Sequence, residues 1–120
     1  MTNPSRTDPK RGELWLLQFD PTRGSEVRKT RPAVILSPAS VGRLPLRIVV
    51  PVTGWSPGYG VIPWLVKLAP DRHNNLQKES AADAFQVKSV SVERFTKRLG
   101  VVRADDLEEI CAAVALCIGA

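Results

Sequence analysis

Most of this chain consists of short apolar runs that alternate with polar residues or are rich in branched side chains, and proline or glycine follows most of them. Runs of about four to eight residues with a period of two predict strands, because successive side chains of a strand point to opposite faces of a sheet. The predicted strands cover residues 12–20, 33–36, 46–52, 64–68 and 84–92. We therefore expect a mainly β protein whose antiparallel strands close into a small barrel.

The last segment has a different period. Apolar residues recur there at the spacing of a helix face: Leu107, Ile110, Cys111, Val114 and Ile118. Asp105 and Glu108 have the spacing of a helix-start capping pair, and Gly119 is a typical helix end. We predict one amphipathic C-terminal α-helix after the strands, and a shorter helical turn within residues 91–97.

Length and composition indicate a single globular domain. The chain has 120 residues, of which 43% are hydrophobic and 24% charged, so it can enclose one core and is not mainly disordered. We expect residues 1–10 to be a flexible lead-in and residues 11–120 to form the domain. No apolar run approaches the roughly 20 residues that span a bilayer, and the N-terminus lacks the apolar core of a secretory signal. These absences predict a cytoplasmic protein with no membrane partner.

Positive charge is concentrated in one segment. Lys and Arg number 17 against 12 Asp and Glu, and the resulting formal net charge of +5 permits a polyanionic partner. The densest basic stretch is the polar segment 21–31, with Arg23, Arg28, Lys29 and Arg31. Arg31 precedes a proline, which favours extended backbone at a loop-to-strand boundary. On composition alone this segment is either a phosphate-binding loop or an ordinary solvated basic loop.

Few residue types are available for catalysis. Two cysteines and one histidine cannot supply four zinc ligands, and the chain contains no phosphate-binding glycine loop and no HExxH motif. His73 lies in a polar loop, where it is either solvated or in contact with a substrate. The remaining polar residues suit phosphate chemistry, because fixed cations stabilise charge that grows on phosphoryl oxygens. RNA carries its own nucleophile in the 2′-OH, so we expect no metal and no cofactor.

Three blocks near the start carry a family resemblance: residues 11–15 (RGELW), 20–26 (DPTRGSE) and 29–37 (KTRPAVILS). Together they resemble the opening of the MazF/PemK/Kid family, the toxins of bacterial toxin–antitoxin pairs that act as ribosome-independent mRNA endoribonucleases. The similarity continues through residues 48–53 (IVVPVT) and 85–90 (FQVKSV) and ends with the C-terminal helix. The resemblance thus covers about residues 11–119.

The resemblance implies a small SH3-like barrel with a terminal helix, functioning as a homodimer. Members of the family cut single-stranded RNA at short motifs without a metal and leave a 2′,3′-cyclic phosphate and a 5′-hydroxyl. A cognate small acidic antitoxin is the implied partner, and we expect its acidic tail to bind the cationic segment 23–31. By position, Arg31 matches the family's catalytic arginine, Thr53 its catalytic threonine and Glu26 a loop glutamate implicated in activity.

Elementary chemistry suggests a role for each of these three residues. A guanidinium stays protonated in proteins, so we expect Arg31 to stabilise the phosphorane rather than act as a base. Glu26 is the candidate base, provided that bound RNA shields it from water. Thr53 would donate a hydrogen bond to a non-bridging oxygen, and the alternative is a strand-end threonine with a satisfied hydroxyl.

Two further groups are candidates for RNA contact. Gln86 and Lys88 are two apart on a predicted strand, so they would share a face toward base and phosphate, unless both simply face solvent. Trp55 and Tyr59 lie in a loop rich in glycine and proline, where Trp55 either stacks on a base or packs on the barrel. The predicted RNA-binding residues are Arg23, Arg28, Lys29, Trp55, Gln86 and Lys88.

Three other aromatic residues have simpler expectations. Phe85 departs from the family pattern, in which many members carry an acidic residue, and it either stacks on a base or fills the core. Trp15 and Trp64 lie within predicted strands and are assigned to the core.

Two other functions are compatible with the same fold. One is a non-catalytic gyrase poison like the CcdB toxins, which share the barrel, and the other is a catalytically inactive RNA-binding relative. The set of Glu26, Arg31 and Thr53 favours the endoribonuclease, because a gyrase poison has no need of these residues.

Overall fold

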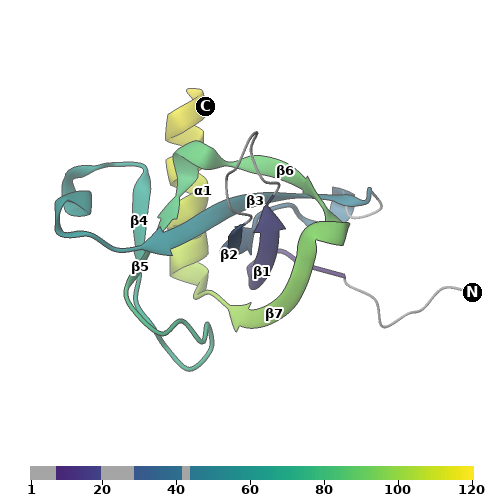
Figure 1. The fold of residues 1–120 in the computed structure, drawn as a ribbon. Helices are drawn as coiled ribbons and strands as arrows, with labels where there is room; N and C mark the ends of the chain where they lie inside the picture. The colour runs from purple at the N-terminus through teal and green to yellow at the C-terminus, as the bar shows by residue number, and fades with distance from the viewer. Residues whose placement is uncertain (1–7, 20–28, 42–43) are drawn as a thin grey trace, which may run out of the picture.

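The computed structural model describes residues 8–19, 29–41 and 44–120. Within these ranges the chain forms seven strands and one α-helix, and every strand pairing is antiparallel (Figure 1). The elements are β1 (Glu13–Phe19), β2 (Lys29–Ile35), β3 (Leu46–Gly54), β4 (Leu65–Leu68), β5 (Ser80–Asp83), β6 (Lys88–Ser91), β7 (Phe95–Val101) and α1 (Ala104–Ile118). The predicted class, mainly β with a C-terminal α-helix, is confirmed.

Strand β3 organises the sheet, whose strand order is β4-β5-β3-β2-β1-β7. One edge of β3 pairs with β2, and the other edge pairs first with β6 and then, toward its end, with β5. The end strands β4 and β7 form no ladder with each other in the described part of the chain. The sheet is therefore open, which corrects the prediction that the strands close into a barrel.

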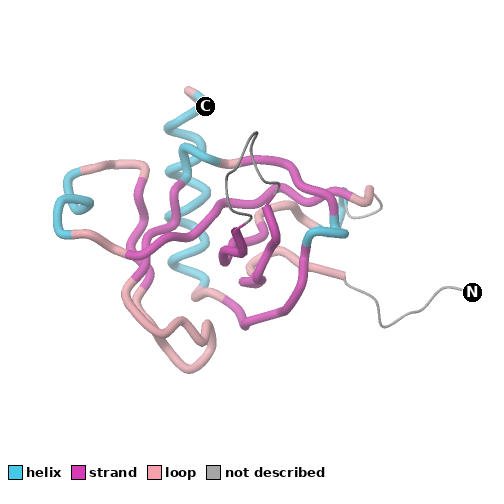
Figure 2. Tube along the Cα trace, in the orientation of Figure 1, coloured by secondary structure: helices cyan, strands magenta, loops and turns pink. Residues whose placement is uncertain are grey.

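The loop between β4 and β5 meets β7 where a closed barrel would have a strand ladder (Figure 2). The Val101 amide donates to the His73 carbonyl at 3.0 Å, and Asn75 Nδ2 donates to the Leu99 carbonyl at 2.6 Å. Gly100 lies between these contacts, and a Cβ on Gly100 would collide with the His73 carbonyl. Glycine alone leaves room for this approach, so isolated contacts from a loop replace the ladder that would close the sheet.

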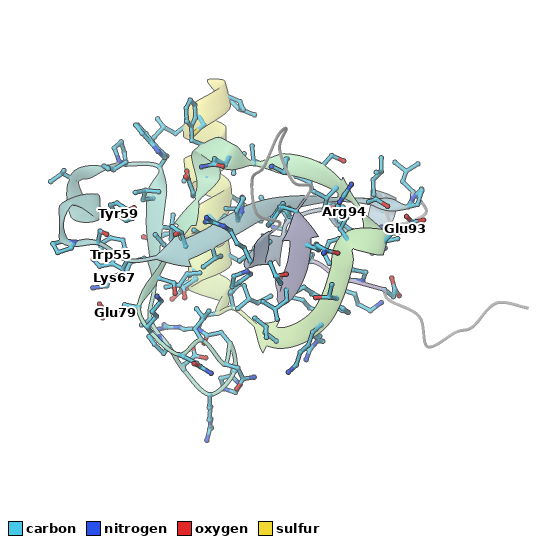
Figure 3. The ribbon with its side chains drawn as sticks, in the orientation of Figure 1. Trp55, Tyr59, Lys67, Glu79, Glu93 and Arg94 are labelled. Atoms are coloured by element: carbon cyan, nitrogen blue, oxygen red, sulfur yellow. The ribbon has the colours of Figure 1, made fainter. Side chains whose placement is uncertain are left out.

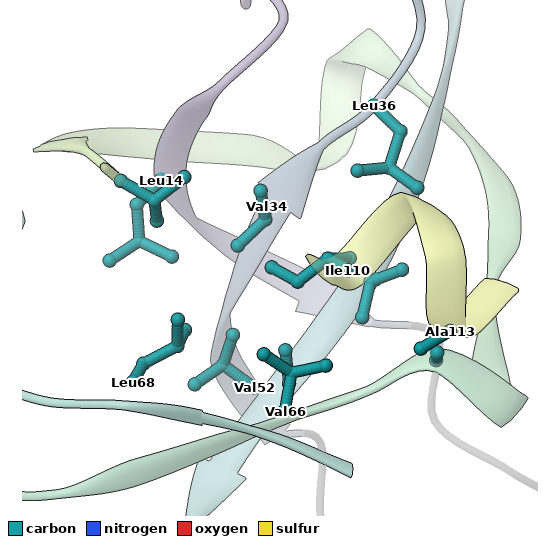
Figure 4. Packing of buried hydrophobic residues seen from close by; sticks show 12 residues of the cluster. Leu14, Val34, Leu36, Val52, Val66, Leu68, Ile110 and Ala113 are labelled. Carbon is teal, nitrogen blue, oxygen red and sulfur yellow. The ribbon is translucent and has the colours of Figure 1, made fainter. Parts of the chain in front are cut away.

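Alternation along the strands divides the buried apolar residues into two clusters on opposite faces of the sheet. On the face toward α1, here called the helix face, Leu14, Val34 and Val52 pack with Ile110 and Ala113 of the helix (Figure 4). The opposite face, here called the distal face, carries Leu17, Ala33, Ile35, Val49, Val90 and Phe95. Leu14 and Leu17 of β1 thus lie on opposite faces, as the period of two expected for residues 12–20 implies.

Two strands were missed by the sequence prediction because neither has an alternating apolar pattern. β5 reads Ser-Ala-Ala-Asp, without a branched side chain, and the middle of β7 is exposed and basic. The predicted strand 84–92 is wrong in its first part, because the Asp83 side chain accepts from the Phe85 amide and caps a 3₁₀ turn over Ala84–Gln86. Only Lys88–Ser91 forms β6. The predicted helical turn within 91–97 is the short 3₁₀ turn Val92–Arg94.

Helix α1 ends as predicted but begins differently. Its N-cap is Arg103, which makes no side-chain capping hydrogen bond, so the predicted capping pair of Asp105 and Glu108 is wrong. Gly119 ends the helix with a left-handed φ of 78°, a conformation that glycine adopts without strain. Among the described residues, no helix has the length and apolar character needed to cross a membrane.

Candidate nucleic-acid interface

Arg31 and Thr53 both lie on the distal face, toward the same end of the sheet. Arg31 of β2 pairs with Leu17 of β1 and shares the face of Ala33 by alternation. Ala33 pairs with Pro51 of β3, and Thr53 is two residues beyond Pro51. Because β2 and β3 are antiparallel, the residue two before Ala33 and the residue two after Pro51 lie in the same direction. The fold thus brings two of the three predicted catalytic residues, Arg31 and Thr53, to one region.

Apolar packing on the distal face stops where these polar side chains begin. Leu17 and Ala33 are fully buried, whereas Arg31 and Thr53 are half-buried. Arg31 lies inside β2 rather than at the loop-to-strand boundary predicted for it, because β2 extends four residues before the apolar run. Its backbone is therefore fixed by a paired strand, while part of its side chain is accessible to a ligand.

Lys88 adds a second cation to this face. It pairs with Val49 of β3, so its side chain shares the face of the distal cluster. Its Nζ lies 5.0 Å from the ring centroid of Phe19, at the end of β1. Within the described residues, neither Lys88 nor Arg31 has a carboxylate within 4.0 Å. We call the group of Arg31, Thr53 and Lys88 the distal site.

Trp55 extends the distal site across β5 and β4. Thr53 pairs with Ala81, which pairs with Lys67, so Lys67 shares the face of Thr53. Lys67 Nζ lies 5.1 Å from the Trp55 ring centroid, and the Tyr59 ring meets Trp55 edge to face at 5.6 Å (Figure 3). The half-buried Trp55 is thus held in place by Lys67 and Tyr59, as the packing alternative predicts, yet it stands beside the distal site.

Gln86 is not placed as predicted. It belongs to the 3₁₀ turn rather than to a strand shared with Lys88, so the argument that the two residues face the same way is wrong. Its side-chain amide donates to Asp83 Oδ2 at 3.0 Å. That carboxylate also accepts from the Phe85 amide at 3.2 Å, through Oδ1. Gln86 is exposed, and its side chain stabilises the turn.

Of the remaining aromatic residues, Trp15 packs against the core, whereas Trp64 and Phe85 lie on the surface. Trp15 is half-buried and meets Phe95 edge to face, with ring centroids 5.8 Å apart, so it belongs to the distal cluster as predicted. Trp64 and Phe85 contact each other on the surface instead, with ring centroids 5.5 Å apart. Phe85 is 65% exposed, and Trp64 precedes β4 and is exposed too. The assignment of Trp64 to the core is therefore wrong, and of the two alternatives for Phe85 the core position is excluded.

Four predicted site residues are not placed by the structure. Arg23, Glu26 and Arg28 lie outside the described residues, and their roles stay predictions. Lys29 begins β2 opposite Phe19, but its side chain is not among the parts that the structure describes.

Two residues near the distal site, Phe19 and Lys67, were not predicted to belong to it. Alternation along residues 12–20 already places Phe19 on the face of Leu17, so the sequence contained that signal. The position of Lys67 beside Trp55 depends on pairing through β5, a strand without an apolar pattern.

The described residues suggest anion binding. No three His, Cys, Asp or Glu side chains among them are grouped closely enough to hold a metal ion, and Cys111 and Cys117 are free thiols. The distal site offers a guanidinium, a hydroxyl and an ammonium group from strands of one sheet. Such donors bind phosphate oxygens, and their charge stabilises negative charge that develops on phosphorus-bound oxygen. Fold and site together define a small open β-sheet protein with a cationic face whose donors suit phosphate oxygens.

Comparisons with known proteins identify the family. A family model described as PemK-like, MazF-like toxin of type II toxin-antitoxin system matches residues 10–118, and this chain belongs to that family. Endoribonuclease toxin MazF of Escherichia coli K12 is 36% identical over 117 residues, which are 96% of this chain and 98% of the relative. Endoribonuclease MazF9 of Mycobacterium tuberculosis is 35% identical over 113 residues, with 89% and 93% covered.

Solved structures show the same fold. MazF of Deinococcus radiodurans superposes with a TM-score of 0.76 at 31% identity, and 96% of this chain and 100% of that chain are covered. A MazE-MazF crystal structure from the same organism gives a TM-score of 0.76 at 29% identity, with 95% and 98% covered.

Proposed function

We propose that this protein is a metal-independent endoribonuclease toxin that cleaves single-stranded RNA at a short sequence motif. The observation that carries the proposal is the placement of Arg31 and Thr53 on the distal face, toward one end of the sheet. The names of the relatives support it, because endoribonucleases of this family match nearly the whole chain.

The reaction follows from the chemistry of the three proposed catalytic residues. The RNA 2′-oxygen attacks the adjacent phosphorus, the bond from phosphorus to the 5′-oxygen breaks, and a 2′,3′-cyclic phosphate and a 5′-hydroxyl result. Glu26 accepts the proton of the 2′-OH, and solvent protonates the departing 5′-oxygen. Arg31 stabilises the charge on the phosphorane and donates a hydrogen bond to the leaving oxygen. Thr53 donates a hydrogen bond to a non-bridging oxygen. Lys88 binds a neighbouring phosphate, and Trp55 offers a ring edge or face to a base.

The proposed partners follow from the family and from charge. A small acidic antitoxin is expected to cover the cationic surface, and one of the similar solved structures is that of a MazE-MazF pair. A homodimer is expected as the active form, because a chain of 120 residues provides only a small surface for an RNA strand. The location of such a toxin is predicted to be the cytoplasm, where its mRNA substrate lies.

Cleavage in the presence of EDTA tests the proposed function. The purified protein is incubated with a long single-stranded RNA and, separately, with DNA of the same sequence. Discrete RNA fragments with cyclic phosphate ends and intact DNA are expected, because DNA lacks the 2′-OH. RNA binding without cleavage would instead identify an inactive RNA-binding relative, and inhibition of gyrase without RNA cleavage would identify a CcdB-like poison. Loss of cleavage in EDTA that Mg²⁺ restores would contradict metal independence.

A further inference from the structure

A groove of about 550 Å³ opens at the end of β3, next to Thr53 of the distal site, and its strand residues Leu16, Pro32 and Val52 lie on the helix face by alternation. Thr53 and Gly54 form its border with the distal site, and its other lining residues come from β1, β2, β3, β5, β7 and the loop between β4 and β5. It lies at the open side of the sheet, where that loop contacts β7. A ligand bound at Thr53 that continues past the end of β3 therefore enters this groove.

The wall formed by the loop is held in shape by internal hydrogen bonds. Asn74 is fully buried, and its Oδ1 accepts from the amides of Asp71 and Leu76 at 3.1 and 2.9 Å. Its Nδ2 donates to the Ala69 carbonyl at 2.9 Å. Together with the contacts of Asn75 and His73 to β7, these bonds fix the loop on the body of the protein. The groove is thus present before any ligand binds.

Two lysines from different elements line the groove. Lys78 comes from the loop, and both its Cε and its Nζ lie 3.3 Å from the position that a Cβ on Gly54 would occupy. The ammonium group of Lys78 is thus next to the backbone that follows Thr53. Lys97 comes from β7, opposite Leu16 of β1.

Neither lysine is neutralised by a described residue. Within 4.0 Å of the Lys78 and Lys97 ammonium groups the described part of the chain has no carboxylate, whereas Lys67 pairs with Glu79 at 3.3 Å and Lys10 with Asp8 at 2.8 Å. Two ammonium groups in one groove, neither paired with a described carboxylate, attract an anion such as a phosphodiester.

The floor of the groove is apolar. Leu16, Pro32, Leu76 and Leu99 are half-buried, and Val52 is only 2% exposed. Flat apolar surface beside cations suits a nucleobase, which carries an aromatic ring next to its phosphate. An acidic peptide needs the cations but has less use for this floor. Gln77 also lines the groove and is exposed, and a side-chain amide of this kind can hydrogen-bond a base edge.

We propose that this groove binds the nucleotide that flanks the cleaved phosphodiester, with Lys78 and Lys97 on its phosphate and the apolar floor under its base. The proposal rests on the proposed endoribonuclease function. Continuity supports it: Thr53 belongs to the distal site and also borders the groove, so one RNA strand occupies both by passing over Gly54. The groove therefore contributes to substrate affinity and to the choice of the flanking base.

Oligonucleotides of graded length test the proposal. The substrates are DNA oligonucleotides with one ribose at a cleavage site mapped on the long RNA, extended by one, two or three nucleotides on either the 5′ or the 3′ side. For the unmodified protein we expect KM to fall on one side as the groove is filled. In a Lys78→Ala/Lys97→Ala variant this gain is lost and KM for the longest substrate rises about tenfold, because two charge-assisted contacts disappear. The shortest substrate is cut at an unchanged kcat/KM.

A charge-matched control separates the groove from general electrostatics. Lys10→Ala/Arg103→Ala removes the same two positive charges from exposed positions outside the groove, and we expect it to keep the gain with length. The variant Lys78→Arg/Lys97→Arg keeps the charges and should restore most of the affinity. Binding of an uncleavable all-DNA oligonucleotide, measured by fluorescence anisotropy, follows the same pattern, with a salt slope lower by about 0.7 per lost phosphate contact.

The outcomes distinguish the two proposals. If the unmodified protein cuts no RNA, the proposed function fails. If it cuts RNA but the groove variant and the control variant show the same KM at every length, the groove proposal alone is overturned. Equal behaviour of the two variants on RNA, combined with weaker binding of a poly-glutamate peptide to the groove variant only, would assign the groove to an acidic peptide instead.

Discussion

The helix face and the distal face of the sheet take their side chains from the same strands but differ in what covers them. On β2, Val34 is buried beneath α1, whereas Ala33 and Arg31 on the other face lead from a small apolar cluster to an accessible cation. On β3 the same divergence separates Val52 from Thr53. On the distal face, apolar packing covers only part of each of these strands. The same strand thus contributes to the core and to the candidate binding site.

The two ends of the distal face also differ in how charge is handled. At one end Glu13 accepts from Trp15 Nε1 at 2.8 Å, from the Lys10 amide at 2.9 Å and from Arg98 Nε at 3.0 Å. At the other end the cations of the distal site have no described carboxylate partner. Charge paired within the protein contributes to stability, whereas charge without an internal partner is available to a ligand. Substitutions at the Glu13 end and at the distal site are expected to separate these two uses of charge.

The largest expected effect is on catalysis by the distal site. Arg31→Ala should lower kcat/KM for RNA by about 10²–10³-fold, because a fixed cation no longer stabilises the phosphorane. Thermal stability should change little, since Arg31 is only half-buried. Arg103→Ala removes an equal charge beside α1 and should leave cleavage unchanged. Cleavage by Arg31→Ala at the unmodified rate would remove Arg31 from the mechanism.

Next in size is the effect on the helix face. Ile110 is fully buried between α1 and the sheet, and Ile110→Ala should lower the free energy of unfolding by about 2–5 kcal/mol through the cavity it leaves. Urea denaturation measures the loss. Cleavage per folded molecule, measured at low temperature, should be unchanged. Leu116→Ala alters the same helix at a position that is 57% exposed, and its stability should stay close to that of the unmodified protein.

A smaller, pH-dependent effect is expected at Glu13. Burial opposes ionisation of Glu13, but the hydrogen bonds from Trp15, Lys10 and Arg98 outweigh it and lower the pKa of the carboxyl group. A lowered pKa in the folded state gives stability that is present above the ordinary value of 4.5 and is lost as the pH falls through the folded value.

Glu13→Gln should therefore destabilise the protein by about 1–2 kcal/mol at pH 7, and the two proteins should converge in acid. Urea denaturation at pH 7 and pH 3 measures the difference. An unchanged gap at pH 3 would show that the lost stability comes from packing and not from charge. Glu108→Gln, on the exposed side of α1, is the control and should have little effect at either pH.

The smallest expected effect is on RNA affinity at Lys88. Because Lys88 is exposed and is proposed to bind a phosphate beside the reacting one, Lys88→Ala should raise KM a few-fold and leave kcat unchanged. The slope of log KM against log salt should fall by about 0.7. Lys88→Arg should retain the affinity. A fall in kcat instead would place Lys88 among the groups that act in the transition state.

The sequence predicted the apolar strands well and the polar ones poorly. Residues 12–20 have the apolar content and the length of a strand, and β1 forms there with Leu14 and Leu17 on opposite faces. β5 and β7 are strands because neighbouring strands offer unpaired edges to them. The local sequences, Ser-Ala-Ala-Asp in β5 and the basic middle of β7, do not show that such edges exist. The alternation of residues 84–92 likewise predicted a strand at Gln86. A local hydrogen bond from the Phe85 amide to the Asp83 side chain turns the chain there instead.

The sequence by itself determined the class of the fold, the separation of Leu14 from Leu17, and the three residues proposed for catalysis. These depend on local alternation and on motifs that keep their spacing along the chain. Only the tertiary structure decided that the sheet stays open. There the loop between β4 and β5 contacts β7 at Gly100, and the contacting residues are more than twenty positions apart in the sequence. The tertiary structure also decided that Lys78 and Lys97 share a groove beside Thr53, because residues from separate elements become neighbours only when the sheet curls.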